Sequence, residues 1–180
     1  MREQGIRAAV VRTTLPIALA LSVHGALACG IRDGSAVEEL SYTFGSAEDA
    51  GRAVLEAVAQ RDVQTLRLMP LTEHEFRTVV WPELPASRAD VSLPFAYAWG
   101  TLAQNSAGSL AQILDRYGGQ QYELTSVRVS GDVTAHPSFT VHRKVELAVR
   151  NAQGEPGRLR LFGSLLERQG QWKIFSYVVD

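Results

Sequence analysis

The sequence predicts an α+β domain in which N-terminal helices pack on an antiparallel C-terminal sheet. Apolar residues between positions 46 and 117 recur at helical spacing, whereas from residue 121 onward they alternate with polar residues at the period of a strand. Helices that come first and strands that come last are typical of the α+β class. The sequence lacks the strand–helix–strand alternation of doubly wound nucleotide-binding folds.

A helix followed by a second, short helix is expected where the domain begins. Ser46 stands at an N-cap position, and the acids Glu48 and Asp49 follow in the first turn, where the helix dipole favours negative charge. The apolar face of this helix continues to about Gln60. Asp62 caps the second helix, which ends at a proline.

A third helical segment and a loop follow. Thr72 and Glu75 form a capping box at the start of a segment that is expected to run from Glu73 to Trp81. Residues 82–92 contain two prolines and are expected to form a loop.

Two separate helices are expected beyond the loop. An apolar stripe at helical spacing runs from Phe95 to Leu102. Ser109 and Gln112 form a second capping box, which predicts that a new helix begins there and ends at Gly118–Gly119.

The last third of the chain is expected to form three or four consecutive antiparallel strands, a meander. In the clearest of them, the spacing predicts that Phe139, Val141, Val145, Leu147 and Val149 share one side. The strand segments are Tyr122–Ser130, Phe139–Arg150, Arg158–Arg168 and Trp172–Val179.

The first 28 residues have the three parts of a secretory signal peptide. A basic start with Arg2, Arg7 and Arg12 precedes an apolar run over residues 15–23, and small residues then lead to Cys29. The apolar run is well below the roughly 20 residues of a transmembrane helix. A signal peptide over residues 1–28 is therefore expected.

Cys29 is the one cysteine of the chain, and two processing routes remain open for it. Cleavage after Ala28 by ordinary signal peptidase would leave a free N-terminal thiol on a soluble periplasmic or secreted protein. The sequence Ala26-Leu27-Ala28-Cys29 also resembles the lipobox of bacterial lipoproteins, with Ala26 where that family usually has leucine. The resemblance implies lipidation of Cys29 and a membrane-anchored envelope protein. Gly30 replaces the aspartate linked to inner-membrane retention in that family, which favours the outer membrane.

The residues after the expected signal peptide are predicted to form a tether and one domain. Residues 29–45 are expected to form a tether, and residues 46–180 a single domain. Leu40, Tyr42 and Phe44 alternate, so a short docking strand is the alternative at the end of the tether. Removal of residues 1–28 leaves 15 basic and 18 acidic side chains, which argues against a nucleic-acid partner. A lone cysteine allows no intramolecular disulfide.

Two segments near the ends of the predicted domain resemble nuclear-transport-factor-2-like (SnoaL-like) domains. They are residues 53–66, in which an apolar helix ends at an aspartate that starts the next helix, and the hairpin over residues 170–177. The resemblance implies a curved antiparallel sheet wrapped on helices, a cone-shaped, cystatin-like fold with an apolar pocket. Some members of that family are isomerases, cyclases or dehydratases, and many others bind ligands or form dimers, so the fold does not choose the function.

Four residues are candidates for lining a pocket. By strand alternation Arg143 shares an apolar face with Val141, where a charge is costly unless it is paired. Arg143 is therefore expected to bind an anion inside the cone, to be turned outward by a bulge, or to form a buried pair with an acid. The aromatic residues Trp81, Tyr97 and Trp99 are expected either to line the pocket or to pack in the core.

No catalytic residue can be assigned, and no metal site or cofactor is expected. His74, His136 and His142 are scattered, and Ser164 lacks the second glycine of a nucleophile elbow. We therefore expect a non-catalytic module that binds an apolar or anionic small ligand or a protein. The alternatives are an isomerase or lyase that uses the cone pocket, and a homodimerisation domain. A buried ionisable group beside a second donor would favour the enzyme, an apolar pocket would favour binding, and an apolar outer sheet face would favour the dimer.

Overall fold

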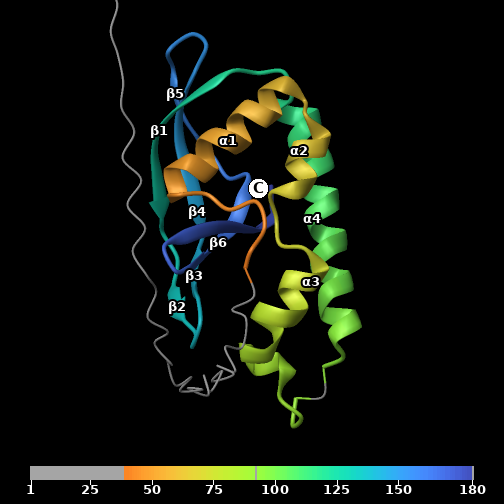
Figure 1. The fold of residues 1–180 in the computed structure, drawn as a ribbon. Helices are drawn as coiled ribbons and strands as arrows, with labels where there is room; N and C mark the ends of the chain where they lie inside the picture. Colours follow the sequence, from red (N-terminus) through yellow and green to blue (C-terminus); the bar gives the residue numbers. More distant parts are fainter. Residues whose placement is uncertain (1–38, 92, 180) are drawn as a thin grey trace, which may run out of the picture. The chain divides into compact units, whose positions relative to one another are not determined.

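Helices come first and strands last in the computed structural model, which describes residues 39–91 and 93–179 (Figure 1). The α+β prediction is confirmed. The chain divides into two units, residues 1–35 and 36–180, and every described residue belongs to the second. Ala28, Cys29 and the expected signal peptide lie outside the described residues, as does the tether as far as residue 38.

The first three helices begin at the predicted caps. They are α1 (Ala47–Gln60), α2 (Val63–Leu68) and the short α3 (Glu73–Glu75). The side chains of Ser46 and Asp62 accept hydrogen bonds from the backbone N–H three residues on, and the Thr72–Glu75 capping box has both of its bonds. Between α1 and α2, Arg61 takes a left-handed conformation with φ of 53°, which turns the chain within two residues.

Helical structure continues past α3 into the segment expected to be a loop. A π-helical turn covers Phe76–Val80, and 3₁₀ turns cover Trp81–Glu83 and Pro85–Ser87. The loop prediction for residues 82–92 is therefore wrong for its first half. Both 3₁₀ turns hold their proline in the first two positions, where the missing N–H removes no helical hydrogen bond.

A single long helix, α4 (Phe95–Tyr117), replaces the two helices predicted for this region. The prediction that Ser109 caps a new helix is wrong, because residues 103–108 are small or polar and contain no proline to interrupt the preceding turn. The predicted end at Gly118 is confirmed. A Cβ at Gly118 would lie 2.3 Å from the carbonyl oxygen of Leu114, so this position requires glycine.

The predicted meander of antiparallel strands is confirmed. The strands predicted over residues 139–150 and 158–168 are each broken in two, as β3 with β4 and β5 with β6. The first predicted strand is β1, and after a break it is followed by a short strand, β2, that the sequence did not predict. The last predicted strand is β7. The breaks divide the strands into one sheet of order β1-β4-β5 and a second of order β2-β3-β6-β7. The bounds are β1 (Tyr122–Val129), β2 (Val133–Ala135), β3 (Thr140–Arg143), β4 (Val145–Asn151), β5 (Pro156–Leu159), β6 (Phe162–Arg168) and β7 (Gln171–Tyr177).

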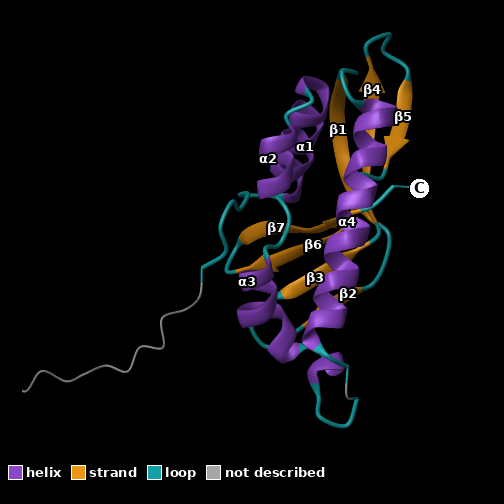
Figure 2. Cartoon of the chain, turned by 90° about the vertical axis from the view of Figure 1, so that its right-hand side faces the viewer, coloured by secondary structure: helices purple, strands orange, loops and turns teal. Residues whose placement is uncertain are grey.

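The three breaks lie side by side and form a crease across the meander. They fall at residues 130–132, at Lys144 and at residues 160–161. Lys144 is left-handed, with φ of 51°, and the N–H of Gly131 donates to the carbonyl of Arg143 across the crease at 3.2 Å. In Figure 2, β3, β6 and β7 run across the view whereas β1, β4 and β5 run up it.

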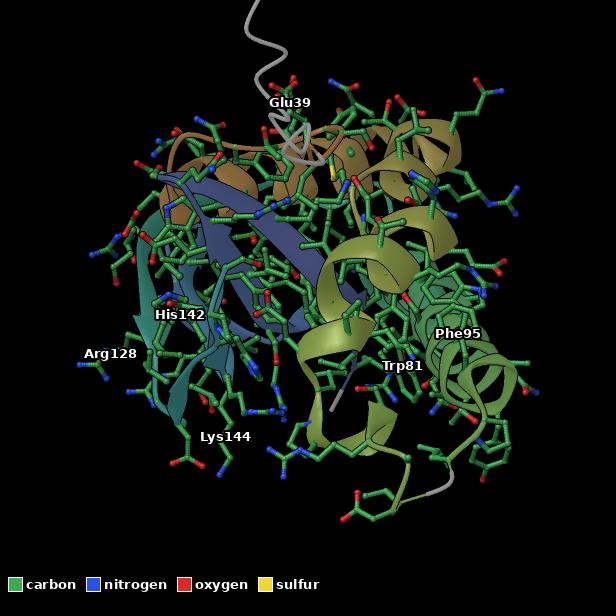
Figure 3. All side chains as sticks on the ribbon, turned by 60° about the horizontal axis from the view of Figure 1, so that its bottom comes forward. Glu39, Trp81, Phe95, Arg128, His142 and Lys144 are labelled. Atoms are coloured by element: carbon green, nitrogen blue, oxygen red, sulfur yellow. The ribbon has the colours of Figure 1, made fainter. Side chains whose placement is uncertain are left out.

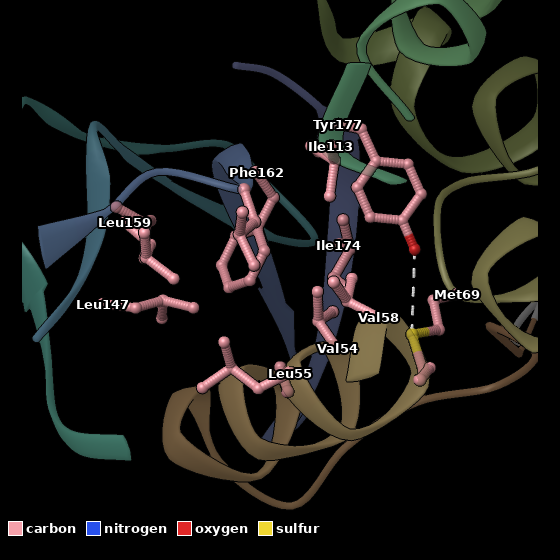
Figure 4. Close-up of a cluster of buried hydrophobic side chains, with 14 of the residues drawn as sticks. Val54, Leu55, Val58, Met69, Ile113, Leu147, Leu159, Phe162, Ile174 and Tyr177 are labelled. Atoms are coloured by element: carbon pink, nitrogen blue, oxygen red, sulfur yellow. Dashed lines mark hydrogen bonds between the residues drawn. The ribbon is translucent and has the colours of Figure 1, made fainter. Parts of the chain in front are cut away.

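Two hydrophobic cores lie on opposite faces of the β2-β3-β6-β7 sheet. In β6 the neighbours Leu165 and Leu166 point to opposite faces, and each belongs to a different core. The large core joins α1, α2, the second half of α4 and both sheets (Figure 4). The aromatic core lies between the other face, the segment 71–84 and the first half of α4.

The crease overturns the prediction that Val141 and Val145 share one side of a strand. Val141 is buried in the aromatic core, whereas Val145 is buried in the large core. Between them Arg143 and Lys144 are exposed, so the outward-turned alternative for Arg143 is the one found. Figure 3 shows the side chain of Lys144 on the outer side of the strands.

Residues 39–45, predicted as the end of the tether, instead pack on the domain. Phe44 is 9% exposed and exchanges two backbone hydrogen bonds of 2.8 Å with Trp172 of β7. The alternative of a docked segment is therefore correct for these residues. Phe44 is held because its ring joins the large core, and its partly buried neighbour Leu40 packs against the aromatic core.

A buried ion pair fastens this segment to α3 and β7. Lys173 is fully buried, and its Nζ donates to the carbonyl of Ser41 at 2.5 Å and lies 3.5 Å from Glu75 Oε1. Glu75 also accepts hydrogen bonds from the backbone N–H groups of Ser41 and Thr72, at 2.6 and 2.7 Å. Burial alone would raise the pKa of Glu75, but these bonds and the charge of Lys173 hold it below its ordinary value.

We predict that Lys173→Met lowers the free energy of unfolding by about 3 kcal/mol or more, because it leaves the Glu75 carboxylate buried without its counter-charge. Lys144→Met, which changes the exposed lysine, should lower it by less than about 0.5 kcal/mol. Urea titration of both variants measures the difference. A double variant with Glu75→Gln should be more stable than the sum of the single changes predicts. Equal stabilities of the two lysine variants would contradict the role given to Lys173.

Candidate functional site

Two of the four candidate pocket residues lie in or beside the aromatic core. Phe76 is its centre, with ring centroids of Trp81 and Trp99 at 6.1 and 5.6 Å. Trp81 also faces Phe95 edge-on at 5.7 Å, beside the start of α4 (Figure 3). Of the two roles expected for Trp81, lining a pocket or packing in the core, the structure shows core packing. Trp99 packs on this core with one side and lines a cleft with another.

The structure does not bring the other two candidates to the same place. Tyr97 is 65% exposed and does not line the cleft that Trp99 lines. Arg143 is exposed beside the crease, so it does not enter an apolar pocket. Of the four candidates, only Trp99 borders the cleft described below.

The candidate site is a cleft of about 300 Å³ between α2, α4 and β7. One wall is α2, and the opposite wall is a face of α4 that extends from Trp99 to Leu114. The floor consists of Phe175 and Tyr177 from β7. The remaining lining residues are Val63, Arg67, Pro70, Leu71, Leu102, Ala103, Ser106, Ala107, Leu110 and Ala111.

The cleft exists because the facing side chains of α4 are small. Ala103, Ala107 and Ala111 recur every four residues and therefore lie on one helical face. Their side chains end at Cβ and leave space beside the helix, whereas the larger Leu110 is 6% exposed and packs into the large core. Ala107 and Ala111 remain exposed at the rim of the cleft.

Tyr177 is the polar centre of the floor and contacts both walls. Its hydroxyl donates to the carbonyl of Leu66 in α2 at 2.6 Å and lies 3.7 Å from Met69 Sδ (Figure 4). Its backbone N–H donates to Ser106 Oγ in α4 at 3.0 Å. Burial raises the pKa of Tyr177, so the hydroxyl stays protonated at physiological pH.

Arg67 is the one charged side chain among the described residues that line the cleft. It lies one helical turn after Val63, and both side chains are exposed at the mouth. The side chain of Arg67 makes no hydrogen bond or ion pair with any residue that the structure describes. Its guanidinium is therefore available to a ligand that enters between α2 and α4.

The arrangement can hold a ligand but offers little for acid–base chemistry. No Asp, Glu or His is found among the described residues that line the cleft. His142, bonded to Glu167 at 2.9 Å, packs instead against Trp172. Across residues 39–91 and 93–179, no group of three or more His, Cys, Asp or Glu side chains is placed to hold a metal ion.

Sequence reasoning missed Val63, Arg67 and the alanines of α4 as site residues. The four-residue spacing of Val63 with Arg67, and of Ala103 with Ala107, was the available signal. That spacing alone does not reveal a cleft, because a cleft requires α2 and α4 to face each other, and 26 residues, 69–94, separate the two helices in the sequence.

Comparisons with models of protein families, with curated proteins and with solved structures find no match to this chain. Among the described residues, no helix has both the length and the hydropathy needed to cross a membrane.

We predict that Tyr177→Phe lowers the free energy of unfolding by about 1–3 kcal/mol, because the buried Leu66 carbonyl loses its donor while the ring stays in place. Tyr97→Phe makes the same chemical change at an exposed position and should have almost no effect. Urea denaturation of both variants tests this. A Tyr177→Phe protein as stable as the wild type would show that the bond to α2 does not hold the cleft wall.

Proposed function

We propose that this chain is a bacterial envelope protein whose domain binds a small apolar ligand in the cleft between α2, α4 and β7, without transforming it. The observation that carries the proposal is the lining: apolar side chains surround a few polar groups, which is the usual make-up of a small-molecule site. The volume of about 300 Å³ lies at the lower end of the range for such sites.

The fold supports the assignment to nuclear-transport-factor-2-like domains. A pair of short helices, a long helix and an antiparallel meander bent at a crease follow one another in the chain. A bent meander packed on helices is what a cone-shaped fold requires. In this proposal the cleft takes the place of the apolar cone pocket, and its opening lies between α2 and α4.

The two alternative functions have less support. An isomerase or lyase needs a base beside a second donor, and the one buried ionisable group on the cleft floor, Tyr177, has its hydroxyl committed to Leu66. A homodimer through the sheet needs an apolar outer face. Between β1 and β4, two facing pairs instead place charges of both signs on the sheet: exposed Glu123 opposite exposed Arg150, and exposed Arg128 opposite half-buried Glu146.

Membrane attachment through Cys29 completes the proposal. The lipobox-like Ala26-Leu27-Ala28-Cys29 and the preceding basic and apolar segments support acylation of Cys29, and Gly30 favours the outer membrane. Because residues 39–45 pack on the domain, the tether comprises residues 29–38. The alternative is a soluble periplasmic or secreted protein that begins at Cys29.

The ligand proposal predicts that the mature protein binds 1-decanol, a neutral apolar probe, and that Ala107→Phe abolishes binding by filling the cleft. Ala96→Phe makes the same change at an exposed position of α4 outside the cleft and should leave binding intact. Native mass spectrometry of protein released from detergent micelles counts the bound decanol molecules. Absence of decanol binding in the wild type, or equal binding in both variants, would overturn the assignment of the cleft.

The attachment proposal predicts that intact-mass measurement of protein from a bacterial membrane fraction finds a lipid-modified chain beginning at Cys29. Cys29→Ser should abolish the modification and release the domain from the membrane fraction. An unmodified wild-type chain beginning at Cys29 would favour the soluble alternative.

A further inference from the structure

We propose that the ligand of the cleft is a single-chain amphiphilic anion, such as a medium-chain carboxylate, whose head binds Arg67 while its apolar chain lies along α4. This inference rests on the proposed function and adds to it the class of ligand. Three features of the cleft carry it: its length, its small volume and the position of its charge.

The cleft is long and narrow. Its α4 wall runs from Trp99 to Leu114, which at about 1.5 Å per residue corresponds to roughly 22 Å of helix. A volume of about 300 Å³ holds on the order of ten groups of the size of water or methylene, at about 30 Å³ each. One straight chain of roughly ten carbons fits this space, whereas a two-chain lipid does not.

The interior of the cleft suits an alkyl chain. Apart from Arg67 at the mouth, its polar side-chain groups are the hydroxyls of Ser106 and Tyr177 and the indole N–H of Trp99. Both hydroxyls already have partners within the domain, and Trp99 stands at one end of the α4 wall. A polar ligand group placed there would lose its water without gaining a full set of hydrogen bonds. Each buried methylene instead contributes about 0.8 kcal/mol.

The mouth supplies the head-group site. Arg67 stands on α2, where its guanidinium has no partner among the described residues. Arginine keeps its charge at every physiological pH and presents a planar fork that fits a carboxylate with two hydrogen bonds. No carboxylate among the described residues borders the cleft, so no protein acid competes for the guanidinium there or repels an incoming anion. The cleft is therefore complementary to an anionic head and an apolar tail.

The experiment compares three probes of equal chain length, decanoate, 1-decanol and decylamine, on the mature protein by native mass spectrometry. We expect wild-type protein to bind decanoate about fivefold more tightly than 1-decanol, and decylamine most weakly. Arg67→Gln should remove the preference for decanoate and leave 1-decanol binding unchanged. Arg67→Lys should retain part of the preference. Arg128→Gln, at an exposed arginine outside the cleft, should change nothing.

The outcomes separate this inference from the function on which it rests. One outcome would be that 1-decanol and decanoate bind equally, that Ala107→Phe abolishes binding of both, and that Arg67→Gln affects neither. In that case the cleft binds apolar ligands, but the anionic class of ligand is wrong. If none of the probes binds, the proposed function itself fails. Ammonium acetate provides a further readout, since raising its concentration should weaken decanoate binding to the wild type and leave Arg67→Gln unaffected. An identical dependence in both proteins would overturn the role of Arg67.

Discussion

The buried pair of Lys173 and Glu75 is the interaction on which the arrangement of the domain depends. It joins three segments that are distant in sequence: the N-terminal residues 39–45, the start of α3 and the final strand β7. Removing two charges from water is expensive, and it is tolerated when the remaining hydrogen-bonding groups are satisfied. Here Ser41 serves both partners, because its carbonyl accepts from Lys173 and its N–H donates to Glu75.

The same strand determines the geometry of the cleft. Four residues after Lys173, Tyr177 donates from its hydroxyl to α2 and from its backbone to Ser106 of α4. One residue of β7 is therefore hydrogen-bonded to both walls of the cleft. Because the alanines of α4 do not fill the space between these walls, the cleft remains open. β7 thus connects the packing of the domain with the formation of the cleft.

Features that depend on neighbours within a few residues could be predicted from the sequence. The caps at Ser46, Asp62 and Thr72 and the end of α4 at Gly118 are of this kind. Features that depend on distant contacts could not be predicted. Ser109 has the local pattern of a helix cap, yet the helix continues through it. Arg143 stands at a position that strand alternation assigns to the buried face, yet the crease exposes it. Trp99 is the one residue of the cleft that was predicted. The others could not be predicted, because α2 and α4 face each other only through tertiary packing.

Lys173 and Arg67 are two cations in opposite surroundings. Lys173 is enclosed, and its charge is compensated by Glu75 within the protein. Arg67 lies at the mouth of an apolar cleft, and the described residues offer it no counter-charge. A charge that is already paired adds little attraction for a ligand, whereas an unpaired one beside a low-dielectric surface attracts the opposite charge more strongly than it would in open water. In the proposed binding mode, selectivity depends on Arg67, while the apolar walls supply affinity for a chain of suitable length.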